Sequence, residues 1–149
     1  MDAVSNKYSV NDIKQVVLPL NIENNGRLVV IEGQRDVPFS ILRSFIVYAE
    51  NGDVRGQHAH KKCSQLLICL NGKILVKCND GESLVDYTLD NPIQGLLIPP
   101  GIWAEQTYET ENTILMVLCD RLYEAEDYVR DFDTFLKVRS SRSKNELGS

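Results

Sequence analysis

The sequence lacks any apolar run close to the roughly 20 residues that span a membrane. Its opening residues, MDAVSNKYSVNDIK, contain no apolar stretch suited to a signal peptide. An excess of basic residues is also missing, because 16 Lys and Arg against 21 Asp and Glu give a formal net charge of -5. A broad nucleic-acid-binding surface needs a clustered basic face. We therefore expect a cytoplasmic protein with no membrane and no nucleic-acid partner.

Several catalytic motifs are missing too. The sequence has no phosphate-binding loop, no dinucleotide-binding fingerprint and no nucleophile elbow. Its four cysteines form neither a C-x-x-C redox motif nor a paired zinc pattern. Cys69, Cys78 and Cys119 lie in apolar runs, so we interpret them as buried free thiols in a reducing compartment.

The composition is that of one ordinary globular domain. Hydrophobic residues make up 43% of the 149 residues and charged residues 25%. A domain of this length can bury roughly 70% of the surface of its unfolded chain. We expect a flexible N-terminus over residues 1–12, a folded domain over 13–138 and a disordered tail, rich in Ser and charge, over 139–149.

About ten short apolar segments, separated by Gly, Pro, Asn and Asp, predict an all-β sandwich or barrel. The dipeptides Asn71-Gly72 and Asp80-Gly81 each predict a hairpin. After Asp120 the pattern changes and predicts short helices. The expected strands cover residues 13–20, at an edge, and 28–32, 40–48, 65–70, 73–78, 83–89, 95–98, 103–108 and 113–118, with a histidine-bearing strand after residue 52; the expected helices cover 124–129 and 131–138.

Both histidines of the protein, His58 and His60, lie in one short segment. Two residues apart on an extended strand, they point to the same face. Imidazole gives and takes a proton near neutral pH, so such a pair lining a cavity suits acid–base catalysis. Two other interpretations stay open: histidines with no chemical role, and a metal site.

The spacing around the histidines is that of the first cupin motif, and a second cupin-like segment covers residues 95–104. Gln65 stands where a metal-binding cupin has Glu, and Ala104 stands where it has its third His. An amide is a poor metal ligand and a methyl group is none, so we expect no metal. The motif residues are Gly52, His58, His60, Gln65 and Gly72.

Three cations could hold an anionic ligand. Arg43 shares a strand face with apolar neighbours, while Arg55 and Lys61 flank the histidines. The planar guanidinium matches phosphate oxygens two at a time, so a diphosphate-bearing ligand would explain these cations in an acidic protein. Trp103 could stack on a ligand or pack in the core, and Glu105 could face the cavity or pair with a cation.

Longer segments show a more specific similarity. From residue 11 to 138 the sequence resembles the dTDP-sugar 3,4-ketoisomerases, and its most specific marks are the HAHK extension and the YVRDFD ending. The matching segments are residues 37–40 (VPFS), 55–62 (RGQHAHKK), 70–72 (LNG), 98–103 (IPPGIW) and 116–135, which includes DYVRDFD.

The resemblance implies a metal-free, cofactor-free cupin homodimer that acts in the cytoplasm. Its substrate would be dTDP-4-keto-6-deoxy-glucose, whose keto group it would move from C4 to C3 through an enediol. The product would enter deoxysugars of surface glycans, such as O-antigen and lipopolysaccharide, or of antibiotics. By resemblance the shuttling pair is His58 and His60, in an order that stays open. The implied substrate-binding residues are Arg43, Arg55, Lys61, Gln65, Trp103 and Glu105.

Two positions depart from the family pattern. Asn25 precedes Gly26 where relatives commonly have Arg, and Ala104 stands where many relatives have His or Arg. These departures leave the C4 stereochemistry of the product open. The downstream pathway and any contribution of a partner chain to the site also stay open. A 3- or 5-epimerase of the cupin superfamily, or a sugar-nucleotide-binding cupin without turnover, remains an alternative.

Overall fold

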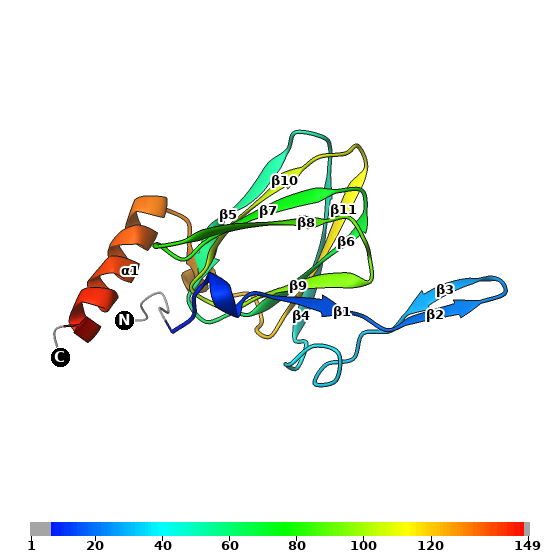
Figure 1. Cartoon of the computed structure of the whole chain (residues 1–149), viewed down its shortest axis with the longest axis horizontal. Helices are drawn as coiled ribbons and strands as arrows, with labels where there is room; N and C mark the ends of the chain where they lie inside the picture. Colours follow the sequence, from blue (N-terminus) through cyan, green and yellow to red (C-terminus); the bar gives the residue numbers. More distant parts are fainter. Residues whose placement is uncertain (1–6, 148–149) are drawn as a thin grey trace.

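The computed structural model describes residues 7–147, and the side chains of residues 7–140. Figure 1 shows a β-barrel from which a hairpin projects on one side and a helix on the other. The paired strands of the barrel are antiparallel, which confirms the predicted all-β class. The helix is the only α-helix in this part of the chain, and it is not long and apolar enough to cross a membrane.

Two five-stranded sheets form the barrel, in the orders β1-β9-β6-β11-β4 and β12-β5-β10-β7-β8. Strand β1 lies at a sheet edge, as Pro19 predicted. The barrel strands are β1 (Lys14–Val17), β4 (Arg43–Ala49), β5 (Val54–His60), β6 (Gln65–Asn71), β7 (Ile74–Asn79), β8 (Leu84–Leu89), β9 (Gln94–Ile98), β10 (Trp103–Tyr108), β11 (Thr113–Cys119) and β12 (Tyr128–Val129). The projecting hairpin consists of β2 (Leu20–Glu23) and β3 (Gly26–Val29).

The central strands β6 and β11 of the first sheet are largely buried on both faces. Leu67 and Leu115 belong to the core inside the barrel, whereas Leu66 and Leu118 belong to a second cluster outside it. Phe39, from the segment between β3 and β4, packs in that outer cluster. Burial on both faces explains why β6 reads as a continuous apolar run and not as an alternating one.

One of the two predicted hairpins is correct. Asp80-Gly81 joins β7 and β8, which pair in register from Ile74↔Leu89 to Asn79↔Leu84. The hairpin predicted at Asn71-Gly72 is wrong, because β6 and β7 lie in different sheets. Gly72 has φ 91, so the turn chemistry is as predicted, but long-range pairing with β11 and β10 separates the strands that the turn connects.

The N-terminal residues within the described range are attached to the barrel. A 3-10 turn, η1 (Val10–Asp12), has a capping box with Ser9, and the Val10 amide donates to the Asp80 carboxylate (2.9 Å). We expected flexibility over residues 1–12. Residues 7–12 have these ordered contacts, and residues 1–6 lie outside the described residues.

The C-terminal region differs most from expectation. Residues 124–129 contain a 3-10 turn, η2 (Ala125–Asp127), followed by strand β12, which pairs with His60 and Ala59, so the helix predicted there is wrong. The second predicted helix is present as α1 (Phe132–Leu147). This helix continues to Leu147 through most of the segment expected to be disordered. The Arg139 guanidinium anchors it, donating to the carbonyls of Gly101 and Tyr8.

Candidate active site

The two histidines lie inside the mouth of the barrel, near the end of β5. Their ring centroids are 4.9 Å apart and the rings are nearly perpendicular, at 89°. Both rings line one small cavity with Gln65 and Ala104. The prediction that the pair shares one face is therefore confirmed.

A β-bulge in β5 brings Arg55 to the side of His58. In the pairing with β10, Ala104 opposes His58 and Glu105 opposes Gly56, so Gln57 is an extra residue. Gly56 and Gln57 both have positive φ, 82° and 56°. A Cβ on Gly56 would also lie 2.9 Å from the Ala104 carbonyl oxygen, so only glycine fits this position. On a regular strand, residues three positions apart such as Arg55 and His58 would face opposite sides. The extra residue in the bulge shifts this alternation by one, so Arg55 lines the same cavity as His58.

The histidines are reached through a cavity of about 90 Å³ at the barrel mouth, which leads toward a constriction beside His60. Polar groups on the wall come from β5, β6 and β10, and apolar groups come from β4, β6 and β11. The lining residues of the wider part are Phe45, Val47, Arg55, Gly56, His58, Gln65, Leu67, Gln106, Leu115 and Val117.

His58 is held by its own strand. Its Nδ1 lies 2.9 Å from the Gly56 carbonyl oxygen, which can only accept, so Nδ1 carries the proton and Nε2 has a free lone pair. Burial lowers the pKa of His58 to about 4, and the neighbouring His60 acts in the same direction. His58 is therefore a neutral imidazole at pH 7.

His60 is held by a carboxylate from another segment. Its Nδ1 donates to Asp127 Oδ2 (2.9 Å), and both side chains are only 7% exposed. The other Asp127 oxygen accepts the Lys62 amide (2.7 Å). Burial alone would raise the pKa of Asp127, but the bonds from His60 and the Lys62 amide outweigh it and lower the pKa. Asp127 is thus a carboxylate that orients His60 and leaves its Nε2 unpaired.

The sequence analysis missed Asp127 and Tyr128. Tyr128 packs its ring against both imidazoles, with centroid distances of 5.0 Å to His58 and 4.4 Å to His60. Its hydroxyl accepts a hydrogen bond from Arg43 Nη2 (3.3 Å). Both residues lie within the DYVRDFD ending, which already indicated the family. Because residues 124–129 were interpreted as a helix, the pairing of this segment with β5 was not predicted.

Two more of the predicted residues meet at this site. Arg43, at the start of β4, donates through Nη2 to Cys119 Sγ (3.5 Å) as well as to Tyr128. Burial opposes a charged guanidinium, but these two bonds outweigh it and keep the pKa of Arg43 raised. Gln65 is 9% exposed, and its Nε2 also donates to Cys119 Sγ (3.6 Å).

The structure does not bring Trp103 and Glu105 to the cavity. Because Ala104 faces inward on β10, its two neighbours face outward. Trp103 packs against Phe132 and Phe135 of α1 and donates to Glu105 Oε1 (3.3 Å). Lys61 follows β5 immediately and is not part of the cavity wall, although its amide donates to the Asp127 carbonyl.

One cluster has side chains of the kind that bind metals. The ligand-type atoms of His60, Cys63 and Asp127 lie within 4.8 Å of one another. The histidine and the carboxylate are already bonded to each other, and the Cys63 thiol donates to the Ser64 carbonyl (3.4 Å). His60 and Asp127 therefore form a hydrogen-bonded pair in which the carboxylate orients the histidine, and Cys63 lies beside this pair.

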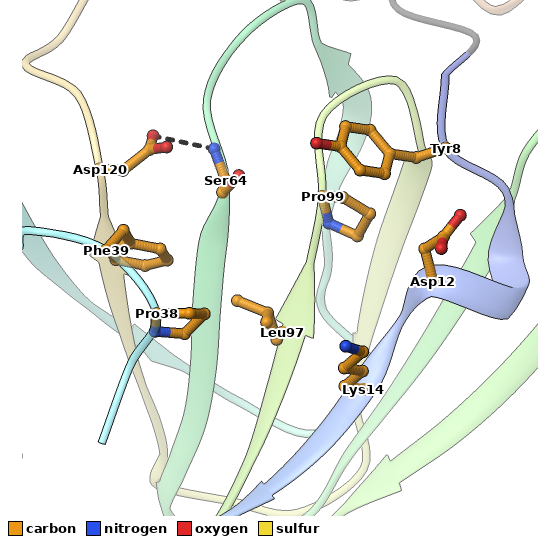
Figure 2. Close-up of a pocket in the computed structure, with 9 residues that line it drawn as sticks. All are labelled: Tyr8, Asp12, Lys14, Pro38, Phe39, Ser64, Leu97, Pro99 and Asp120. Carbon is orange, nitrogen blue, oxygen red and sulfur yellow. Dashed lines mark hydrogen bonds between the residues drawn. The ribbon is translucent and has the colours of Figure 1, made fainter. Parts of the chain in front are cut away.

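A second hollow, larger than the barrel mouth, lies on the outer face of the sheet that contains β1 and β9 (Figure 2). Its volume is about 270 Å³, and its wall is formed by Tyr8, Asp12, Lys14, Pro38, Phe39, Ser64, Leu97, Pro99 and Asp120. The Asp120 carboxylate is bonded to the Ser64 amide (2.9 Å), as Figure 2 shows. This wall has no histidine and none of the predicted site residues.

A two-sheet barrel with a histidine pair in its mouth belongs to the cupin class. In agreement, the fold matches the dTDP-4-dehydrorhamnose 3,5-epimerase of Bacillus anthracis with a TM-score of 0.71, over 82% of this chain and 79% of that one. The two sequences are 22% identical, so this match concerns the fold alone.

Closer similarities define the family. The family model described as "FdtA: WxcM-like, C-terminal" matches residues 8–140. The TDP-4-oxo-6-deoxy-alpha-D-glucose-3,4-oxoisomerase of Aneurinibacillus thermoaerophilus is 40% identical over 117 residues, 78% of this chain and 84% of that protein. QdtA, a sugar 3,4-ketoisomerase from Thermoanaerobacterium thermosaccharolyticum solved with TDP, matches with a TM-score of 0.86 and 31% identity, over 90% of this chain and 98% of that one. The chain belongs to this family of sugar 3,4-ketoisomerases, as its sequence predicted.

Proposed function

We propose that this protein moves the keto group of TDP-4-keto-6-deoxy-glucose from C4 to C3 through an enediol, with His58 and His60 as the proton-transfer pair. The observation that carries the proposal is the pair itself: two imidazoles from one strand line one cavity, and a different group holds the Nδ1 atom of each. Support for the substrate comes from the relatives, since a histidine-to-asparagine variant of QdtA was solved with TDP-4-keto-6-deoxyglucose.

The reaction must move two protons by one position each. The hydrogen on C3 goes to C4, and the hydrogen on the C3 hydroxyl goes to the C4 oxygen. His60 is the better candidate for the carbon proton, because the Asp127 carboxylate stabilises the imidazolium that forms when Nε2 takes it up. The neutral His58 can relay the hydroxyl proton, because its free Nε2 accepts from one oxygen and donates to the next.

The cations of the site have binding and electrostatic roles in this proposal. Arg55 lies at the wider part of the cavity and suits the diphosphate. Arg43 does not line the cavity wall, but it is bonded to Tyr128, which packs against both rings, and its charge suits the negative charge that develops on the enediol oxygens. Gln65 lines both parts of the cavity and can hydrogen-bond the sugar.

A homodimer is part of the proposal. The β2-β3 hairpin projects away from the barrel (Figure 1), and its exposed apolar side chains include Leu20, Ile22 and Leu28. A short two-stranded hairpin is marginally stable in water unless something covers it. We expect a second copy of the chain to cover it, and light scattering coupled to gel filtration measures this directly. A monomer at micromolar concentration would contradict it.

Product analysis tests the reaction. Purified protein is incubated with TDP-4-keto-6-deoxy-glucose, and the sugar is examined by NMR. A ketone at C3 supports the proposal. A ketone that stays at C4 with inversion at C3 or C5 would mean an epimerase, and an unchanged sugar that still binds would mean a binding protein; either result overturns it.

A further inference from the structure

Two hydrogen-bond donors converge on the sulfur of Cys119, the last residue of β11. Arg43 Nη2 lies 3.5 Å from Sγ and Gln65 Nε2 lies 3.6 Å from it. Cys119 itself is fully buried, at 0% exposure. The donors come from β4 and β6, on either side of β11, so only the folded barrel brings them together.

This arrangement supplies an anion where Arg43 needs one. Arg43 is half-buried, and its Nε is shielded from solvent without a hydrogen-bond partner. Taking a cation out of water is costly unless it is paired, and within the described part of the chain no carboxylate forms an ion pair with Arg43. A neutral thiol is a weak acceptor, whereas a thiolate is a charged one and can satisfy several donors at once. The convergence of donors is therefore the environment of a thiolate.

The other cysteines show the contrast. Burial raises the pKa of Cys69 to about 11 and that of Cys78 to about 12, as expected for thiols among apolar side chains. The pKa of Cys119 is lowered chiefly by the neighbouring Cys63 thiol, and the bonds from Arg43 and Gln65 add to this effect. Cys63 keeps its proton, which it donates to the Ser64 carbonyl, and its own pKa is raised by the neighbouring Cys119 and by burial.

We propose that Cys119 is a buried thiolate that positions Arg43 and Gln65 for the sugar nucleotide. This role rests on the proposed function, because it assumes that these two residues bind the substrate. The titratable groups that face the Cys119–Arg43 pair are Cys63, Tyr123 and Tyr128, and none of them is a carboxylate; Asp127 lies beside Cys63. Cys119 does not line the cavity and acts through its neighbours, so it is a positioning residue.

The first test is the ultraviolet absorbance of the thiolate, measured against pH on the folded protein without substrate. As the pH is lowered, wild type should lose the absorbance of one thiolate at a pH below the pKa of an ordinary thiol. The Cys119→Ser variant should lack this step. The Cys69→Ser variant is the matched control, since its hydroxyl can replace the thiol as donor to the Asn71 carbonyl, and it should keep the step. A wild-type protein with no such step would overturn the proposal.

A second variant keeps the test decisive if Cys119→Ser does not fold. Arg43→Gln retains a polar side chain but removes the charge beside the sulfur. The absorbance step should then move to higher pH. An unchanged step in Arg43→Gln would show that the sulfur charge does not depend on Arg43, and this also overturns the proposal.

The third measurement concerns the site and uses turnover of TDP-4-keto-6-deoxy-glucose, because Arg43 and Gln65 are assigned to its sugar and not to its diphosphate. At pH 7.5, Cys119→Ser should have a kcat/KM about tenfold below that of wild type, whereas Cys69→Ser should match wild type. Calorimetric titrations with TDP, which lacks the sugar, should give the same affinity for wild type and for both variants. An unchanged kcat/KM in Cys119→Ser would refute the positioning role. The absorbance test needs no substrate, so a failure of the thiolate is distinguishable from a failure of the proposed isomerase activity.

Discussion

Two of the hollows in the described part of the protein differ in volume and in the reactive groups that line them, and the smaller one has more of these groups. The outer hollow holds about 270 Å³, and the barrel mouth only about 90 Å³. Yet the barrel mouth has two histidines, a buried carboxylate behind one of them and a cluster of groups with shifted pKa values. In the outer hollow, the Asp120 carboxylate is engaged by a backbone amide (Figure 2). Convergent polar groups, not volume, indicate where the chemistry occurs.

The largest effect should follow from removing the base inside the barrel. His60→Asn should lower kcat about a thousandfold, because the carbon proton loses its acceptor. TDP affinity should stay within about threefold of wild type, since the cations are untouched. His58→Asn should cost less, about a hundredfold. Steady-state kinetics with NMR detection of the 3-keto product measures both, and kcat values within tenfold of wild type would place the reaction outside this cavity.

A smaller loss should follow from Asp127→Asn. The amide oxygen can still accept from His60 Nδ1, but the negative charge that stabilises the protonated ring is gone. We expect kcat to fall about 10- to 100-fold with little change in KM. Asp133→Asn, at an exposed position in the first turn of α1, serves as the charge-matched control. If both variants have wild-type kcat, Asp127 has no part in proton transfer.

The half-buried His58 should make stability depend on pH. In the folded protein its pKa is lowered to about 4, whereas an unfolded chain takes up the proton near the usual pKa of 6.5. Between these values the unfolded state binds more protons, so the stabilising contribution is complete above pH 6.5 and is lost as the pH falls toward 4. The loss is on the order of 2 to 3 kcal/mol. Urea unfolding at pH 7 and pH 4.5 should show a drop that is smaller in His58→Asn; equal drops would mean that His58 charges freely in the folded protein.

The smallest effect should come from the outer hollow. Lys14 lies in its wall on the edge strand β1 and does not line the barrel cavity. Lys14→Ala should change kcat and KM by less than about twofold, because surface substitutions away from a site usually cost little. A tenfold loss in the same kinetic assay would show that the two hollows are coupled.

What the sequence could predict was local. Strand β5, the shared face of its two histidines and the neutral Gln65 follow from spacing and alternation within a few residues. The all-β class follows from short strands and turn residues in the same way. Each of these features depends on the chain near the residue in question, so no tertiary contact was needed to find them.

What the sequence could not predict depends on partners far along the chain. Asp127 reaches His60 only because the two-residue strand β12 pairs with β5, and so short a strand has no periodicity to detect. Arg55 reaches the cavity through the bulge at Gly56, which reverses the alternation. Trp103 and Glu105 share a face, but which face looks inward is set by the packing of α1 against β10.

The most direct test is hydrogen exchange at C3 of TDP-4-keto-6-deoxy-glucose in deuterated water, followed by NMR with wild type, His58→Asn and His60→Asn. We predict that wild type exchanges this hydrogen and that His60→Asn loses the exchange while it still binds TDP. Full exchange in both variants would contradict the central claim that the histidine pair inside the barrel transfers the protons.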